Sequence, residues 1–222
     1  MNFVPFLLFV AVGEVGQAFD VREYVAVEEG GRPEIGGGVP TALADQVDAV
    51  VHLAALPSVP RSVDDPASTH RHCVDATFTL LMAARDARVK RFVYAASSSA
   101  YGDTPTLPKV ETMAPSPLSP YAVGKLVGEY YCSVFSSVFG LETISLRYFN
   151  VFGPRQDPHG EAGVVAIFSG RLLEGKPCTV YGDGRQTRSF CYVSDLIEGI
   201  YRLMNSDEHE PVNIGNPQEI SI

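Results

Sequence analysis

The chain has 222 residues, of which 45% are hydrophobic and 19% are charged, and its mean hydropathy is close to zero (+0.06). This composition predicts a globular protein with a sizeable core, built as one large domain or as one domain and part of another. The formal net charge of −9 argues against nucleic-acid binding, which requires a basic surface.

The chain begins with an apolar segment, residues 1–12, which lacks a basic region and is too short to span a bilayer. We therefore expect a buried first strand there rather than a signal peptide or a membrane anchor. Residues 33–40, which include three consecutive glycines, are expected to form a loop.

From residue 48 onward, segments with strand and helix patterns alternate. Strands are predicted over residues 49–53, 92–96, 143–148, 179–181 and 212–214. Helices are predicted over residues 66–87, 120–139, 164–173 and 195–204. This alternation predicts an α/β fold with a doubly wound, Rossmann-like parallel sheet, which binds ligands beyond the carboxyl ends of its strands.

The cysteines and histidines show no CxxC motif and no spacing typical of metal ligands. The four cysteines are Cys73, Cys132, Cys178 and Cys191. We interpret them as free thiols of a reducing compartment, and we expect a cytoplasmic protein without a metal site.

Tyr121 and Lys125 lie four residues apart in the helix predicted over 120–139, so their side chains share one face. A free tyrosine has a pKa near ~10, and a neighbouring ammonium group is expected to lower it. The serine run 97–99 follows a predicted strand and could hold a substrate oxygen. Together these groups could take a proton from an alcohol as hydride leaves its carbon.

Three ordered motifs carry a resemblance to a known family. They are R-F-V-Y-A-A-S-S-S-A-Y-G-D (91–103), S-P-Y-A-V-G-K (119–125) and L-R-Y-F-N-V-F-G-P (146–154). The chain from about residue 48 to residue 222 resembles the extended short-chain dehydrogenase/reductase family, and within it the nucleotide-sugar epimerases and dehydratases.

The resemblance implies that NAD is the cofactor. Tyr121 would be the acid/base, and Lys125 would lower its pKa and bond the nicotinamide ribose. The hydroxyl partner would be Ser97, with Ser98 as the neighbouring alternative. The segment Leu53-Ala54-Ala55 matches a motif whose small side chains let the backbone pass close to the cofactor.

Further roles follow from the same resemblance. Asp20 and Val21 would border the adenine, or else form a surface turn, and Phe149 would contact the nicotinamide or belong to the core. The residues expected to bind the nucleotide-sugar substrate are Asn150 and Arg188 at the diphosphate and Val180 and Tyr181 at the base. A planar guanidinium suits two phosphate oxygens.

The residues after Ser97 favour one reaction type over others. Related dehydratases and decarboxylases carry carboxylic acids where this chain has Ser98 and Ser99. Serines cannot supply acid/base carboxylates there. The resemblance therefore implies 4-epimerisation of a UDP-hexose, or of its N-acetyl form, through a 4-keto intermediate, with a dehydratase or decarboxylase as the alternative.

Two departures from the family pattern favour a further alternative, a silent family fragment. The glycine-rich phosphate loop is not recognisable in Gly13-Glu14-Val15-Gly16 or in the glycines at 36–38, and Cys73 replaces a usual asparagine. We expect an incomplete or divergent member of the family. Residues 1–155 would form the NAD-binding Rossmann-like domain, with its first strand and glycine loop missing or divergent. Residues 156–222 would combine part of a substrate-binding domain with returning Rossmann elements, and the whole would form a homodimer through its helices.

Overall fold

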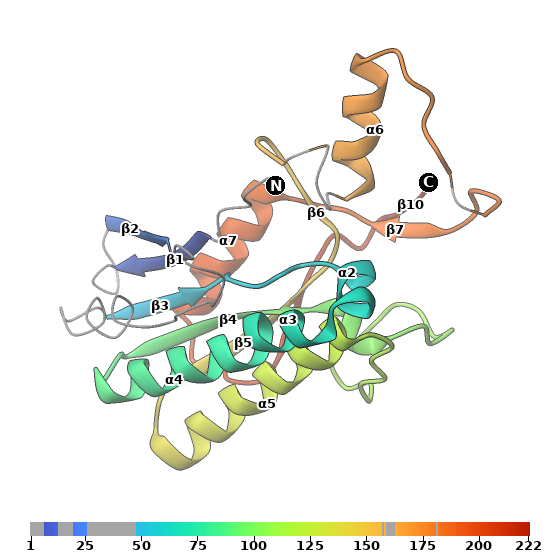
Figure 1. The fold of residues 1–222 in the computed structure, drawn as a ribbon. Helices are drawn as coiled ribbons and strands as arrows, with labels where there is room; N and C mark the ends of the chain where they lie inside the picture. Colours follow the sequence, from blue (N-terminus) through green and yellow to red (C-terminus); the bar gives the residue numbers. More distant parts are fainter. Residues whose placement is uncertain (1–6, 13–19, 26–47, 157, 159–162, 181) are drawn as a thin grey trace.

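The structure is a computed structural model, and it describes residues 7–12, 20–25, 48–156, 158, 163–180 and 182–222. Its centre is a four-stranded sheet with the order β3-β4-β5-β9, in which all neighbouring strands run parallel (Figure 1). The strands are β3 (Ala49–His52), β4 (Arg91–Ser97), β5 (Thr143–Tyr148) and β9 (Val212–Ile214). Strands β3 to β5 are buried over almost their whole length, as expected for a parallel sheet covered on both faces. The predicted Rossmann-like sheet is confirmed.

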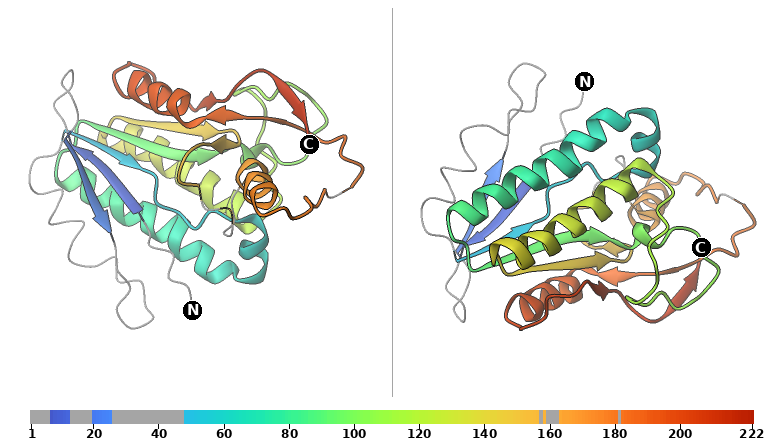
Figure 2. Two further views of the ribbon diagram at one scale, coloured as in Figure 1. Left: turned by 90° about the horizontal axis from the view of Figure 1, so that it is seen from above. Right: turned by 90° about the horizontal axis from the view of Figure 1, so that it is seen from below.

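Helices α4 (Ala76–Asp86) and α5 (Pro120–Phe139) cover one face of this sheet, and they lie side by side (Figure 2). Their apolar side chains pack against Phe92 and Tyr94, which alternate along β4 and point to this face. The other face is covered by α7 (Val193–Met204), whose buried side chains pack against the intervening strand residues.

Helix α5 has the residue bounds that the sequence predicts, because its two ends carry strong signals. The Ser119 Oγ accepts a hydrogen bond of 3.1 Å from the Ala122 amide, and Pro120 occupies the first helical position. Gly140 ends the helix in the left-handed conformation, with φ of 69°. The start of α5 is therefore well defined, and it carries Tyr121.

The helix predicted over residues 66–87 is one helical run of three parts. It consists of α3 (Pro66–His70), a π-helical turn η1 (Arg71–Asp75) and α4. A short helix that was not predicted, α2 (Val59–Asp64), precedes it. The π-helical turn contains Cys73, which is buried against α5.

The remaining C-terminal elements lie beyond the carboxyl ends of the sheet (Figure 1). They are α6 (Val164–Leu173), the parallel pair β6 (Val151–Phe152) and β8 (Cys191–Tyr192), and the antiparallel pair β7 (Thr187–Ser189) and β10 (Glu219–Ser221). The strand predicted over 179–181 was wrong for Thr179 and Val180, which lie in an irregular connection, while Tyr181 is outside the described residues.

Near the N-terminus, β1 (Leu7–Val12) pairs antiparallel with β2 (Asp20–Val25), and β1 lies beside β3. A strand was expected within residues 1–12, and β1 confirms it for residues 7–12. Both glycine segments considered for the phosphate loop, 13–16 and 36–38, lie outside the described residues. No helix in the described parts of the chain is long and apolar enough to cross a membrane.

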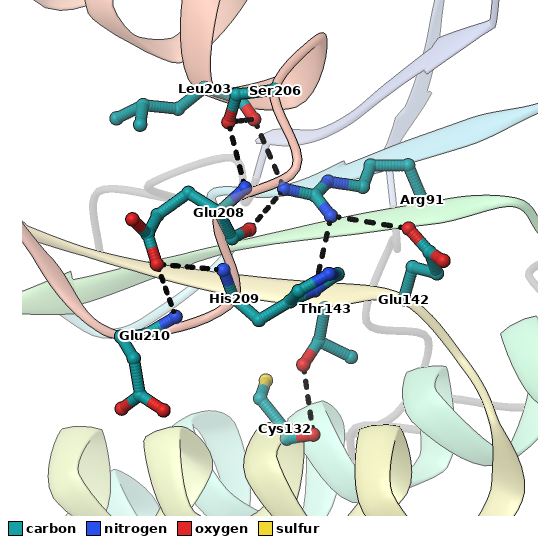
Figure 3. A network of polar contacts seen from close by, with 9 residues as sticks. All are labelled: Arg91, Cys132, Glu142, Thr143, Leu203, Ser206, Glu208, His209 and Glu210. Carbon is teal, nitrogen blue, oxygen red and sulfur yellow. Dashed lines mark hydrogen bonds and ion pairs between the residues drawn. The ribbon is translucent and has the colours of Figure 1, made fainter.

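Arg91 ties the C-terminal end of α7 to the start of β4 (Figure 3). Its Nη2 donates to the carbonyl oxygens of Leu203 (3.1 Å) and Glu208 (2.5 Å), and its Nη1 lies 3.5 Å from Glu142 Oε2 and 3.4 Å from His209 Nδ1. The side chain is almost fully buried, with 5% exposed. Arg91 therefore holds the last turn of α7 and the segment that follows it against the start of β4, through the carbonyls of Leu203 and Glu208.

We expect Arg91→Met to lower the free energy of unfolding by about 2 to 4 kcal/mol, because two partly buried carbonyls lose a charged donor. Urea unfolding followed by circular dichroism measures the change. The neighbouring Lys90→Met is the control, since the Lys90–Asp48 ion pair is exposed on its lysine side and is expected to contribute less than ~1 kcal/mol. Equal costs for the two variants would contradict this role of Arg91.

Candidate functional site

Tyr121 and Ser97 come together where β4 ends and α5 begins. Tyr121 lies in the first turn of α5, and Ser97 is the last residue of β4. The Ser97 hydroxyl lies close enough to the Tyr121 phenol to act on its pKa. The Ser97 Oγ also accepts from the Ser99 amide (3.2 Å) and from the Ser99 Oγ (2.8 Å), which fixes its orientation. Of the two serines considered from the sequence, Ser97 is therefore the one that faces the phenol.

Lys125 lies one turn further along α5, and it is buried with 3% of its surface exposed. Its Nζ donates a hydrogen bond of 2.7 Å to the Ala95 carbonyl oxygen. Burial lowers the pKa of Lys125 to about 8, although the nearby thiols of Cys73 and Cys132 act in the opposite direction. The amine is therefore only partly protonated at mildly alkaline pH.

The expected lowering of the Tyr121 pKa by Lys125 is not found in this structure. Burial raises the pKa of Tyr121 to about 12, the Cys73 thiol adds to the rise, and the hydrogen bond from Ser97 opposes it. The cost of burying a phenolate therefore outweighs any attraction to the amine. At neutral pH the phenol is protonated, so on its own it can donate a proton but is a poor base.

The segments expected at the cofactor follow neighbouring parallel strands. Leu53, Ala54 and Ala55 come directly after β3, and Phe149 comes directly after β5. Since Ser97 ends β4, these groups lie at the carboxyl edge of three adjacent strands, where open α/β sheets bind ligands. This edge is therefore where a bound dinucleotide is expected.

Phe149 packs in a fixed place at this edge. Its ring centroid lies 6.3 Å from that of Tyr101, and its amide donates to the Ile214 carbonyl (3.1 Å). Asp20 and Val21 are not brought to this edge by anything the structure describes. They are the first residues of β2, in the separate antiparallel pair, so the suggested surface turn is wrong and the adenine-side role stays a prediction.

A pocket of about 490 Å³ lies between α6 and the segments before and after β7. It is lined by three of the residues expected to bind the substrate, Asn150, Val180 and Arg188. The fourth, Tyr181, is outside the described residues. Residues that the sequence analysis did not single out also line it, including Arg171, Gln186, Phe152, Phe168 and Phe190. The pocket thus combines two arginines with aromatic side chains.

Asn150 connects this pocket to the sheet edge. It follows β5 by two residues and takes a positive φ of 31°, which asparagine tolerates better than most residues. Its Nδ2 donates to the Ser189 carbonyl (2.9 Å), and its own carbonyl accepts from the Cys191 amide (3.2 Å). Because Tyr148 pairs with Ser97 in the sheet, the pocket begins close to the Ser97–Tyr121 pair.

A buried ionic network beneath the site was missed by the sequence analysis. The Arg147 guanidinium binds both carboxylate oxygens of Glu129 and donates to the Tyr101 hydroxyl (2.8 Å), which donates to Asn213 Oδ1 (2.7 Å). The arginine and glutamate side chains are 4% and 5% exposed. The available signal was Glu129 itself, a charge four residues after Lys125 on the buried face of α5.

The chain is similar to known proteins of one family. Residues 39–215 match the family model described as the NAD dependent epimerase/dehydratase family. The chain is 45% identical over 156 residues to a UDP-glucose 4-epimerase of Mycolicibacterium smegmatis, covering 70% of this chain and 50% of that protein. It is 39% identical over 182 residues to UDP-glucuronic acid decarboxylase 1 of Xenopus tropicalis, covering 80% of this chain and 43% of that protein.

Among solved structures, the chain resembles UDP-glucose 4-epimerase from Thermotoga maritima with UDP-glucose. The TM-score is 0.80 at 36% identity, over 82% of this chain and 60% of that one. The chain therefore spans about half of the length of the epimerase from Mycolicibacterium smegmatis and of the decarboxylase, and three fifths of the solved Thermotoga maritima structure.

Proposed function

The chain belongs to the NAD-dependent epimerase/dehydratase family, and we propose that it catalyses the 4-epimerisation of a nucleotide sugar, with a UDP-hexose as substrate. The observation that carries this proposal is the Ser97 hydroxyl beside the Tyr121 phenol, with Lys125 one turn away on α5. A hydroxyl and a phenol that lie side by side can both hydrogen-bond one substrate oxygen, and the phenol can transfer the proton of that oxygen.

In the proposed reaction, Ser97 would hold the C4 oxygen of the sugar while the Tyr121 phenol exchanges the proton of that oxygen. Bound oxidised NAD supplies the hydride acceptor and a positive charge that favours the phenolate. The same two side chains would return the proton when the 4-keto sugar is reduced on its other face. No net redox change results, so the cofactor is recycled in place.

Leu53, Ala54, Ala55 and Phe149 would hold the cofactor at the sheet edge, together with Tyr121 and Lys125. The supporting observation is their position after adjacent parallel strands. Lys125 can donate further hydrogen bonds, since an ammonium carries three hydrogens and the Ala95 carbonyl takes one.

In the proposed function, residues 1–155 would form the cofactor-binding part. Residues 156–222 would form the substrate-binding part together with returning strands of the sheet.

The nucleotide would occupy the pocket beside α6. Arg188 and Asn150 line it and would contact the diphosphate, and Val180 would contact the base. A guanidinium can bind two phosphate oxygens at once, which suits a diphosphate. Arg171, a second arginine in the lining, adds positive charge to a chain whose formal net charge is −9.

A decarboxylase or dehydratase remains the second candidate, because one relative is a decarboxylase at an identity close to that of the epimerases. The turn after β4 speaks against it. This turn, η2 (Ser98–Tyr101), offers hydroxyl groups at Ser98 and Ser99, where an elimination would need carboxyl groups. We therefore favour epimerisation.

A homodimer through α4 and α5 is supported by exposed apolar side chains on their outer faces. Val123, Tyr130, Val134 and Val138 of α5 are between 46% and 66% exposed. Their spacing forms a helical stripe, as expected for a surface that a second helix pair covers.

The four cysteines are free, in keeping with a cytoplasmic location.

We expect the purified protein to carry NAD, because an enzyme that recycles its cofactor does not need to release it. The measurement is heat denaturation followed by an enzymatic assay of the supernatant for NAD. Lys125→Met should retain less NAD, and the exposed Lys176→Met should retain as much as the unchanged protein. A supernatant without NAD, together with absent UDP-sugar conversion on adding NAD, would favour a catalytically silent family member instead.

A further inference from the structure

Lys125 rests on the side chain of Tyr94, a residue that no part of the proposed function uses. The ammonium group lies 5.1 Å from the centre of the Tyr94 ring, within the range of a cation–π contact. The same ammonium donates to the carbonyl of Ala95, the next residue of β4. Tyr94 and Ala95, two successive residues of β4, therefore fix the position of the Lys125 amine relative to the sheet.

Tyr94 also sets the distance between β4 and the backbone of α5. Its hydroxyl donates to the Lys125 carbonyl oxygen (3.3 Å). The ring lies directly on Gly128, where a Cβ atom would meet the Tyr94 oxygen at 2.3 Å and its Cζ at 2.5 Å. A side chain at position 128 would push the ring or the helix away, so the contact requires glycine.

The ring itself has no room to move. Tyr94 is fully buried, and the imidazole of His52 packs against it with ring centroids 5.6 Å apart. His52 is fixed in turn by its hydrogen bond of 2.8 Å to the Thr77 hydroxyl. Tyr94 is thus a rigid spacer between the sheet and the helix turn that carries Lys125.

We propose that Tyr94 is a positioning residue for Lys125, and that its ring on Gly128 fixes where the amine lies relative to Tyr121 and the cofactor site. The expected effect of Tyr94 on turnover rests on the proposed function. Its expected effect on the environment of the Lys125 amine does not.

The test compares three variants of the full chain. Tyr94→Leu removes the ring, Tyr94→Phe keeps the ring and removes only the hydroxyl, and Phe92→Leu is the matched control. Phe92 lies two residues earlier on the same face of β4, is equally buried and also packs on His52, at 6.0 Å. Tyr94→Met is the replacement if the leucine variant does not fold, because a flexible thioether fills irregular space better.

The first readout is the pH titration of the Lys125 side chain by NMR of ¹³Cε-labelled lysine, with the signal assigned by its loss in Lys125→Arg. We expect the midpoint near 8 in the unchanged protein and in Phe92→Leu, and a smaller displacement in Tyr94→Phe than in Tyr94→Leu, because Tyr94→Phe loses the hydroxyl that bonds the Lys125 carbonyl. In Tyr94→Leu the midpoint should move by more than about 0.5 pH units, since both the ring face and its exclusion of water are lost. The same midpoint in Tyr94→Leu and Phe92→Leu would overturn the proposal.

The second readout is UDP-sugar interconversion. We expect kcat to fall at least about tenfold in Tyr94→Leu, with KM changed far less, to fall less in Tyr94→Phe, and to stay within about twofold in Phe92→Leu. Equal kcat losses in Tyr94→Leu and Phe92→Leu would assign Tyr94 to the core alone. If the unchanged protein shows no turnover, the proposed function fails, and the titration still decides on Tyr94.

Discussion

Tyr121→Phe is expected to reduce UDP-sugar interconversion by at least about a thousandfold, while the protein keeps its fold and its NAD. The phenol is the titratable group beside the Ser97 hydroxyl, which accepts hydrogen bonds from Ser99. Its removal takes away the atom that would exchange the proton of the sugar oxygen. The measurement is a coupled assay of product formation at saturating substrate, with NAD content determined on the same sample.

The matched control is Tyr131→Phe, on the same helix. Tyr131 is half-buried, and its ring packs against Phe78 with centroids 5.2 Å apart. Loss of that hydroxyl should leave interconversion within about twofold, because Tyr131 packs against the core and not against the site. Retention of more than a tenth of the activity in Tyr121→Phe would mean that another group carries the proton.

Arg147→Met is expected to lower the free energy of unfolding by about 3 to 5 kcal/mol, the largest loss of stability predicted for this chain. The substitution leaves the Glu129 carboxylate buried without its cation, and it also removes the donor to the Tyr101 hydroxyl. Arg147 also stacks on the Tyr101 ring, 4.8 Å from its centre. Urea unfolding monitored by circular dichroism measures the loss.

Two comparisons separate this ion pair from ordinary charge removal. Arg202→Met breaks the pair with Glu198 on α7, in which both side chains are more than half exposed, and it should cost less than ~1 kcal/mol. The double variant Arg147→Met with Glu129→Met should recover part of the stability, since no charge is then left buried. An Arg147→Met cost equal to that of Arg202→Met would contradict the role of the network.

The sequence predicted most of the regular elements, because their signals are local. The bounds of α5 follow from Ser119, Pro120 and Gly140, and the strands of the central sheet follow from short apolar runs. The strand predicted over residues 179–181 was wrong for Thr179 and Val180, because a local signal does not show whether a partner strand is present. β-Branched residues there favour an extended chain, but the segment lines a pocket and has no partner strand among the described residues.

The sequence predicted which residues of the candidate site lie close together, but not the direction of the Tyr121 pKa shift. The motifs locate Ser97, Tyr121 and Lys125, and the structure brings them to one place. The sign of the Tyr121 pKa shift depends on how deeply the phenol is buried, which no local pattern encodes. Likewise, Arg147 and Glu129 lie 18 positions apart in the chain, and only the packing of α5 on β5 shows that they meet.

Ser97, Tyr121 and Lys125 all come from one stretch of chain, residues 97–125, whereas the pocket beside α6 is built from residues 150–222. In the proposed function, acid–base chemistry and substrate recognition would therefore come from separate, successive parts of the polypeptide. If the roles divide in this way, replacing residues 150–222 would change which compound is accepted without altering the acid–base residues. The same acid–base residues could then serve different sugars by exchange of one segment.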